Sequence, residues 1–471
     1  MQIEKIERAL SFPFISAANK PGFREAGYVE EEYFMRGTAN VYQEDGRDGR
    51  QVIHSDIPYC NRFLVRKPGK EEAFSGDVVI EILNATAGFD IDRMWILGKE
   101  EIMRQGAAYV GITSKPDVIP CMKAFDSERY DALSWKVPYG REEKSWQKDC
   151  DALSLPKDKE SETGLFWDML TELAEYLKGE NELVPSGAKR CLYLAGWSQS
   201  VGYMTAYRNR FAFARDGRNL FDGYLAAGGV HALTVPLNQD DYGRDIPFTS
   251  KVEYMPVPYI AIQTESENAH FMAYENRQEN ADEEKLRYRI YELAGATHDT
   301  VYTLLDYYRG DDYLKEVGVY PQYVGENEFP NDYPHELACA AIYRHLFRWV
   351  RDGIVPPVAP RIEVDEDLEN RQDAFGNAVG GVRLPQIDAP VCTYYKYSDA
   401  KMMPGGKNAL FGHVVPFTGE RLVQLYGSLQ EYRAKVEALA NEQIERGFLL
   451  PEDRETCVAD AVAKAEKYGL K

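Results

Sequence analysis

The sequence predicts an α/β fold in which a mostly parallel central sheet is flanked by helices on both faces. Six short apolar runs have the length and composition of buried strands, at residues 77–83, 108–113, 191–195, 224–227, 259–263 and 287–293. Helical patterns lie between several of them. In residues 161–179, for example, Leu165, Met169, Leu173 and Leu177 recur every fourth residue. Strands that alternate with helices are typical of a parallel sheet covered on both faces.

The 471 residues exceed the usual size of one domain, so we expect a core with extensions. Residues 1–75 are polar with short β-like pieces, and we interpret them as a β-rich extension packed on the core. Residues 76–350 carry the alternating pattern and form the predicted core. Two long polar, aromatic-rich stretches near 230–252 and 307–333 interrupt it and are interpreted as lid insertions. For residues 351–471 we expect a C-terminal extension of loops followed by helices.

Composition limits the partners and the compartment. The chain has 55 Lys and Arg against 76 Asp and Glu, a net charge of −21, which repels phosphate backbones and anionic lipid. We therefore expect neither nucleic acid nor a membrane as partner. The seven cysteines are odd in number and widely spaced, as free thiols in a reducing compartment would be. Residues 1–8 have no apolar stretch, and no apolar run approaches the ~18 residues that span a bilayer, so we expect a cytoplasmic protein.

The string Gly196-Trp-Ser198-Gln-Ser200 follows the predicted strand 191–195 and opens a predicted helix. A sharp strand-to-helix turn of this kind exposes the serine oxygen at the carboxyl edge of the sheet. The positions two before and two after the serine must be small, and Gly196 and Ser200 meet that need, although the usual pattern has a second glycine. We interpret the string as the nucleophile elbow of an α/β-hydrolase fold with Ser198 as nucleophile. The alternative is a plain strand-to-helix turn.

A serine nucleophile needs a base, which in this fold follows the last strand. His298 comes directly after residues 287–293 and is the predicted base; the alternative is a loop histidine with a structural hydrogen bond. The acid that orients the histidine should follow the preceding strand. Glu265 and Glu267 both follow residues 259–263. In an extended chain, residues two apart point the same way, so direction does not separate them.

An oxyanion hole needs two backbone N–H groups. One should come from Gln199, directly after the nucleophile. The second should come from the loop after residues 108–113, where Ser114 and Lys115 stand; the alternative there is a plain turn before Pro116. No His, Cys or acidic cluster has the spacing of metal ligands, so we expect neither a metal nor a cofactor.

The sequence resembles the bacterial alpha/beta hydrolase domain-containing proteins, a family of carboxylesterase type. The similar segments lie at residues 27–33, 37–42, 79–84, 109–113, 196–200, 264–267, 294–298, 349–357, 375–383 and 447–453. The family commonly has Ser-Gln-Ser at the nucleophile, as in this chain. The resemblance favours Glu265 as the acid, because the family keeps Glu there and varies Asp and Glu at the position of Glu267. The usual acid position of the fold favours Glu267 instead.

The resemblance implies hydrolysis of a carboxylic ester, a small-molecule substrate, through an acyl-enzyme on a Ser-His-Glu triad. Two alternatives remain. The first is an acyltransferase or thioesterase on the same fold, and the second is a catalytically silent binding protein. Neither the fold nor the triad identifies the ester or the oligomeric state.

Overall fold

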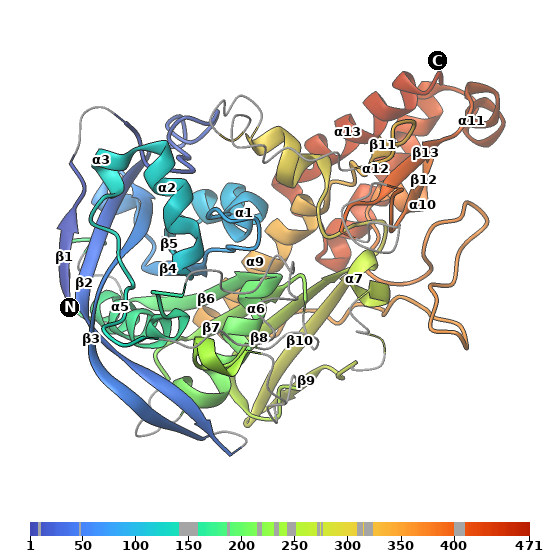
Figure 1. Cartoon of the computed structure of the whole chain (residues 1–471). Helices are drawn as coiled ribbons and strands as arrows, with labels where there is room; N and C mark the ends of the chain where they lie inside the picture. Colours follow the sequence, from blue (N-terminus) through green and yellow to red (C-terminus); the bar gives the residue numbers. More distant parts are fainter. Residues whose placement is uncertain are drawn as a thin grey trace. The chain divides into compact units, whose positions relative to one another are not determined.

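The computed structural model describes residues 1–7, 11–46, 49–140, 159–185, 189–213, 219–229, 235–242, 251–270, 274, 277–308, 314, 324–399 and 410–471 (Figure 1). These residues form two compact units. The first comprises Met1–Trp95 and Ile102–Tyr259, and the second comprises Ile96–Glu101 and Ile260–Lys471. More than half of each predicted insertion, 230–252 and 307–333, lies outside the described residues. The predicted domain boundaries near residues 75 and 350 stay a prediction.

The strands of the first unit lie in the sheet order β1-β2-β3-β5-β4-β6-β7. Their bounds are β1 Gln2–Lys5, β2 Tyr28–Asp45, β3 Gly49–Pro68, β4 Asp77–Ile82, β5 Ala108–Ile112, β6 Cys191–Trp197 and β7 Gly223–Ala227. β4 runs parallel to β5 and β6, and β6 runs parallel to β7. Every residue of β4 to β7 is buried, which is why these strands are almost continuously apolar. The four strands predicted in this part of the chain are therefore confirmed.

β2 and β3 form one long antiparallel hairpin, and β3 continues the sheet by pairing antiparallel with β5. Residues 51–56 of β3 are exposed, whereas Tyr59–Arg66 are buried. The sequence predicted only short β-like pieces here. In the exposed half the apolar residues Val52 and Ile53 are adjacent, so it lacks the alternation of apolar and polar residues by which a strand is recognised.

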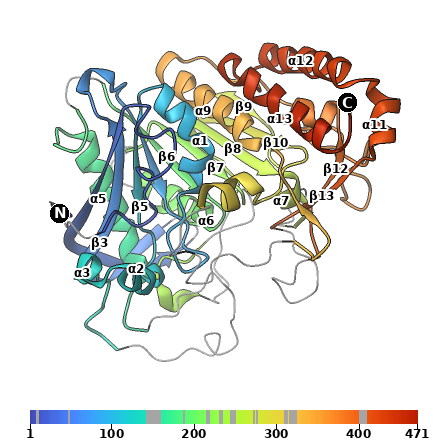
Figure 2. The ribbon, with the colours of Figure 1, turned by 90° about the horizontal axis from the view of Figure 1, so that it is seen from above.

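Helices of the first unit pack on the parallel strands. α5 (Phe166–Lys178) and α6 (Gln199–Tyr207) both contact β6 (Figure 2). α6 continues into one π-helical turn over Arg208–Ala212. At the start of α1 (Arg93–Arg104), the carboxylate of Glu81 in β4 accepts the N–H groups of Met94 and Trp95, each at 2.9 Å. A carboxylate at a helix N-terminus satisfies donors that the helix leaves unpaired. Burial raises the pKa of Glu81 to about 8, and the negative charge of Asp92 adds to the rise.

The chain passes from the first unit into the second within β8, and the strand order continues β8-β10-β9. Here β8 is Met255–Thr264, β9 is Ala281–Glu283 and β10 is Leu286–Leu293. A short helix, α7 (Glu265–His270), follows β8 without a loop. The longer α9 (His335–Asp352) ends at Gly353, whose φ of 68° is the left-handed conformation that favours glycine.

The C-terminal part of the second unit holds short elements followed by helices. The elements are α10 Pro385–Asp388, α11 Gly419–Tyr426, α12 Leu429–Arg446, α13 Arg454–Lys467, and a small sheet of β11 Phe329–Pro330, β13 His413–Pro416 and β12 Cys392–Tyr395. α12 starts with a capping box in which Ser428 and Glu431 satisfy each other's backbone N–H groups. α12 and α13 pack on each other. Among the described helices, none is both long and apolar enough to cross a membrane.

Candidate active site

Ser198 occupies the turn between β6 and α6 in a strained backbone conformation. Its φ is 56° and its ψ is −123°, and a non-glycine residue in such a region costs about 1–3 kcal/mol. Two backbone hydrogen bonds hold it there. The Ser198 N–H donates to the Ala227 carbonyl at 2.8 Å, and the Val201 N–H donates to the Ser198 carbonyl at 2.8 Å. The strand–turn–helix context predicted for this serine is present, with the strain that a nucleophile elbow requires.

The neighbours of Ser198 are close enough to exclude larger side chains. A Cβ added to Gly196 would lie 3.1 Å from the Cβ of Ser200, so only a very small residue fits at position 196 without moving the helix. Ser200 is itself 2% exposed. The serine at position 200, in place of the usual glycine, is thus accommodated, and the glycine at position 196 is the one that the packing demands.

The candidate oxyanion residues follow β5 and β6, two strands of the parallel sheet that have β4 between them. Gln199 is the first residue of α6, after β6, while Ser114 and Lys115 follow β5. β5 and β6 both run parallel to β4, which lies between them. The residues that follow β5 and β6 therefore lie at the same carboxyl edge of the sheet. The Ser114 hydroxyl donates to the Leu83 carbonyl at 2.6 Å. The hydroxyl of Ser114 is therefore used in a structural hydrogen bond, and any contribution of Ser114 to an oxyanion hole would come from its backbone N–H.

Lys115 is a nearly fully buried cation, 2% exposed. Its Nζ lies 5.8 Å from the centre of the Tyr203 ring, which is a favourable cation–π distance. Burial lowers the pKa of Lys115 to about 8, and the negative charge of Asp117 opposes that shift. Burying the charged form of Lys115 lowers the stability of the folded protein. Residues at functional sites often carry such a cost.

Replacing Lys115 with Met is expected to raise the free energy of unfolding at pH 7 by up to about 3 kcal/mol. The pKa of Lys115 is lower in the folded protein than in the unfolded chain, so the penalty is full below about pH 8. Above pH 8 the penalty declines, and it is lost once the lysine of the unfolded chain also loses its proton, at about pH 10.4. Urea unfolding of Lys115→Met and wild type at pH 7 and pH 10 measures this. Lys285→Met, at an exposed position, is the control and should change little. A gain for Lys115→Met that does not shrink at pH 10 would contradict the expectation.

His298 and Glu267 form a buried pair in the second unit. His298 Nδ1 lies 2.6 Å from Glu267 Oε1, and the two residues are 4% and 1% exposed. The other carboxylate oxygen of Glu267 accepts the Thr264 N–H at 2.8 Å, and the His298 N–H donates to Ser266 Oγ at 2.9 Å. With the Nδ1 proton donated to a carboxylate, Nε2 is the ring nitrogen that can accept a proton from a nucleophile.

Glu265 makes other contacts in this structure, although the family resemblance favoured it as the acid. Its carboxylate accepts the Gly295 N–H at 2.8 Å and the Asn370 side-chain N–H at 2.9 Å. The physical reason is that α7 begins at Glu265. In a helix, residues two apart are separated by about 200° around the axis, so they do not share the direction that an extended chain would give them. Burial raises the pKa of Glu265, while its two hydrogen bonds oppose the rise.

The predicted residues therefore form two groups. Ser198, Gln199, Ser114 and Lys115 belong to the first unit, while His298, Glu267 and Glu265 belong to the second. Sequence reasoning missed Asn84, whose side-chain amide donates to the Trp197 carbonyl at 3.0 Å, directly before the nucleophile. Its position after the end of β4, at the carboxyl edge, was the available signal. Among the described residues, no group of three or more His, Cys, Asp or Glu is placed to hold a metal ion.

The buried parallel sheet, its helices and the strained serine between β6 and α6 define the α/β-hydrolase fold. The sequence model of the alpha/beta hydrolase domain family matches residues 3–459, and the chain belongs to this family. A comparison with curated proteins gives no match.

The solved structures that match this chain share little sequence with it. A glucuronoyl esterase from Solibacter usitatus is 10% identical, with a TM-score of 0.31, over 62% of this chain and 80% of that one. An alpha-beta serine hydrolase homologue from Coxiella burnetii is 9% identical, with a TM-score of 0.26, over 50% and 82%. Esterase Est22 is 10% identical, with a TM-score of 0.29, over 57% and 72%. Similarity this low carries no information about the substrate.

Proposed function

We propose that this protein is a serine hydrolase that cleaves a carboxylic ester through an acyl-enzyme, with Ser198, His298 and Glu267 as its triad. The observation that carries the proposal is the backbone of Ser198. A strained serine at the carboxyl end of a buried parallel strand, at the first turn of a helix, has a structural cost and no evident structural benefit. The same geometry presents a hydroxyl for nucleophilic attack.

The His298–Glu267 pair supplies the second support. A histidine whose Nδ1 proton is held by a buried carboxylate is fixed in one tautomer and can carry a positive charge transiently. Family membership adds the chain order Ser198, then the acid, then His298. The proposal requires that His298 Nε2 accepts the proton of Ser198 Oγ, and the experiments below test that requirement.

In the proposed reaction, Ser198 Oγ attacks the ester carbonyl carbon while its proton passes to His298 Nε2. The carbonyl oxygen becomes an oxyanion that accepts the N–H of Gln199 and a second N–H from Ser114 or Lys115. The carbon–oxygen bond to the alcohol then breaks, and the alcohol leaves with the proton from His298. Water, deprotonated by the same histidine, attacks the acyl carbon; the bond to Ser198 Oγ breaks, His298 returns the proton to that oxygen, and the acid is released.

The direct test is labelling of the purified full chain with a fluorophosphonate, followed by hydrolysis of a panel of aryl and sugar esters. We expect labelling of one residue, Ser198, located by peptide mass spectrometry, and turnover of at least one ester. Activity should survive excess EDTA, because the proposed steps use only side chains and backbone N–H groups. Labelling at another residue, or activity that chelation removes and a metal restores, would contradict the proposal. An acyltransferase would instead prefer an added alcohol over water as acceptor.

A further inference from the structure

The loop that carries His298 is joined to α7 by hydrogen bonds on one of its flanks. Residues 294–299 follow the end of β10, and we call them the His298 loop. The Glu265 carboxylate accepts the Gly295 N–H at 2.8 Å, and the Glu265 N–H donates to the Ala296 carbonyl at 3.0 Å. Both the side chain and the backbone of the first residue of α7 therefore hold this loop.

The other flank of the His298 loop is held by the C-terminal part of the chain. At the start of the loop, the Ala294 N–H donates to the Val382 carbonyl at 3.1 Å. At its end, the Asp299 N–H donates to the Leu410 carbonyl at 2.9 Å. All of these residues belong to the second unit. Residues far along the chain thus supply backbone partners to both ends of the loop.

Glu265 links the two flanks through its second carboxylate oxygen. Oε2 accepts the Gly295 N–H, while Oε1 accepts Asn370 Nδ2 at 2.9 Å. Glu265 and Asn370 are 6% and 8% exposed. Hydrogen bonds to an ionised acceptor are roughly twice as strong as those between neutral groups. A chain of two such bonds therefore runs from Asn370 to Gly295, three residues before His298.

Packing limits the movement of Gly295 as well. Its φ is 79°, and a Cβ added to it would lie 2.4 Å from Ile387 Cδ1 and 3.3 Å from Tyr333 Cδ2. Ile387 and Tyr333 are both buried. The loop backbone therefore lies directly against these side chains, while the Glu265 carboxylate binds its N–H group. Close packing and hydrogen bonding together fix the backbone of Gly295.

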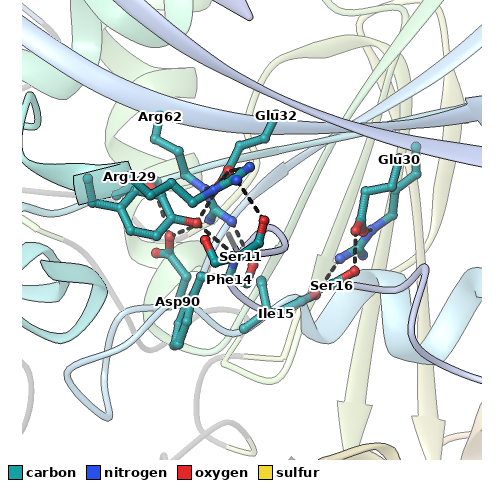
Figure 3. Close-up of polar contacts among 12 residues, drawn as sticks. Ser11, Phe14, Ile15, Ser16, Glu30, Glu32, Arg62, Asp90 and Arg129 are labelled. Atoms are coloured by element: carbon teal, nitrogen blue, oxygen red, sulfur yellow. Dashed lines mark hydrogen bonds and ion pairs between the residues drawn. The ribbon is translucent and has the colours of Figure 1, made fainter. Parts of the chain in front are cut away.

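A buried carboxylate holds an irregular segment at another place in this chain. In the first unit, Glu30 Oε1 accepts the Ser16 hydroxyl at 2.5 Å (Figure 3). Glu30 Oε2 accepts the Ala17 N–H at 2.8 Å and pairs with Arg66 at 2.8 Å. The segment held there has turns but neither helix nor strand. Glu265 makes the same kind of contact, but the loop that it holds carries the proposed base.

We propose that Glu265 and Asn370 are positioning residues for His298, and that they hold the His298 loop so that Nδ1 stays within hydrogen-bond distance of Glu267. This inference rests on the proposed function. The two atoms of the His298–Glu267 pair lie 2.6 Å apart, which leaves little room for displacement of the ring. A misplacement of ~1 Å can cost about 10²-fold in rate. Glu265 and Asn370 act on the reaction only through the histidine.

The first test compares the kinetics of Glu265→Leu, Glu265→Gln and Asn370→Leu. Leucine is close in size to glutamate but removes the acceptor of the Gly295 N–H. We expect Glu265→Leu to lower kcat about 10- to 100-fold, with KM changed less than about twofold. Glu265→Gln keeps an oxygen for the Gly295 N–H and should restore most of that loss. Asn370→Leu removes only the second hydrogen bond of Glu265, so its kcat should fall between the two.

Asp168 in α5 provides the matched control. Its carboxylate also accepts one backbone N–H and one side-chain amide, both from Asn40, at 2.8 and 2.9 Å. Asp168 is 7% exposed and belongs to the first unit. Asp168→Leu should lose a similar amount of stability, measured by urea unfolding, but it should keep the kcat of wild type.

A second readout needs no substrate. The proton of a short hydrogen bond between histidine and a buried carboxylate resonates far downfield of the other protons of a protein. In protein labelled with ¹⁵N-histidine, this resonance can be assigned to His298 Nδ1 by its loss in His298→Gln. We expect wild type and Asp168→Leu to show it, and Glu265→Leu to shift or lose it. If Glu265→Leu fails to fold, Asn370→Leu carries the same test, with a smaller shift expected.

Three results would overturn the inference while the proposed hydrolase function stands. The first is wild-type kcat and an unchanged resonance in Glu265→Leu and Asn370→Leu. The second is a loss no larger than that of Asp168→Leu, which would reflect stability alone. The third is a Glu265→Gln variant as impaired as Glu267→Gln, which would make Glu265 the acid itself.

A wild-type protein that is neither labelled by the fluorophosphonate nor active on any ester would overturn the proposed function, and this inference with it. The resonance separates that outcome from a failure of positioning alone, because it reports the His298–Glu267 hydrogen bond without any turnover.

Discussion

Replacing Ser198 with Ala is expected to lower kcat for ester hydrolysis by ~10⁴–10⁶, because the attacking oxygen is removed and the remaining groups act only through binding and oxyanion stabilisation. Fluorophosphonate labelling should disappear with it. The measurement is steady-state kinetics on an ester identified in the panel, with the same preparation used for thermal unfolding. Ser75→Ala, beside the first residue of β4, is the matched control, and its turnover should equal that of wild type.

The backbone of Ser198 gives this prediction a second, independent part. Alanine at position 198 keeps the strain, since φ is 56° for any residue there, so Ser198→Ala should be about as stable as wild type. Glycine adopts positive φ readily, so Ser198→Gly should be more stable than Ser198→Ala, by about 1 kcal/mol. An inactive but unfolded Ser198→Ala would say nothing of catalysis, whereas a folded, labelled and active one would show that another residue is the nucleophile.

Replacing Glu267 with Gln is expected to lower kcat by roughly 10⁴, as the loss of the oriented tautomer does in the serine protease that serves as the worked example of the triad. In Glu267→Gln, the amide can present either its oxygen or its NH₂ group to His298. The Thr264 N–H, which now donates to the other carboxylate oxygen, favours the amide oxygen on its own side. The NH₂ group then faces Nδ1 and stabilises the tautomer that carries its proton on Nε2, which cannot accept the proton of Ser198.

Glu265→Gln is the matched control two residues earlier, and it should lose far less activity. Its carboxylate accepts two N–H groups, so the new NH₂ group needs an acceptor. The Oδ1 atom of Asn370 is buried and has no hydrogen-bond partner among the described residues, and rotation of the Asn370 amide would bring that oxygen to the glutamine. The measured quantity is kcat for both variants on one ester. If Glu265→Gln is the impaired enzyme, the family-based preference was the better guide. If neither is impaired, the acid lies elsewhere, and the next candidates are Asp240 and Asp241, which follow β7 in the chain.

The parts of the fold that could be predicted from the sequence are those with strong local patterns. The parallel strands are short apolar runs because both of their faces are buried, and the elbow is a strand, a small-residue turn and a helix. The orientation of Glu265 and Glu267 could not be predicted in this way. The segment Glu-Ser-Glu-Asn-Ala-His carries no strong helix signal, and its helical conformation places the two carboxylates in different directions.

The contacts of Asn84, Asp90 and Thr113 had no sequence signal either, apart from their place near strand ends. They join the loop after β4 to Trp197 in β6, to Arg62 in β3 and to Thr113, one residue after β5. Each hydrogen bond depends on a register that only the assembled sheet fixes. The hairpin of β2 and β3 was missed for a related reason. The outer half of β3 is exposed to solvent on both faces. Its sequence therefore lacks the apolar pattern that packing against a core would require.

The position of β4 at the centre of the parallel strands has a consequence for the synthesis of the chain. One side of β4 pairs with β5, about 30 residues later, but the other side pairs with β6, where Asp77 meets Cys191, 191 − 77 = 114 residues further on. At ~5–20 residues per second, a ribosome needs roughly 6–23 s to supply that partner. Throughout this time an apolar strand edge is open to pairing with other chains. The charged Asp77 and Glu81 interrupt that edge, and charges within a strand are one way in which proteins discourage such pairing.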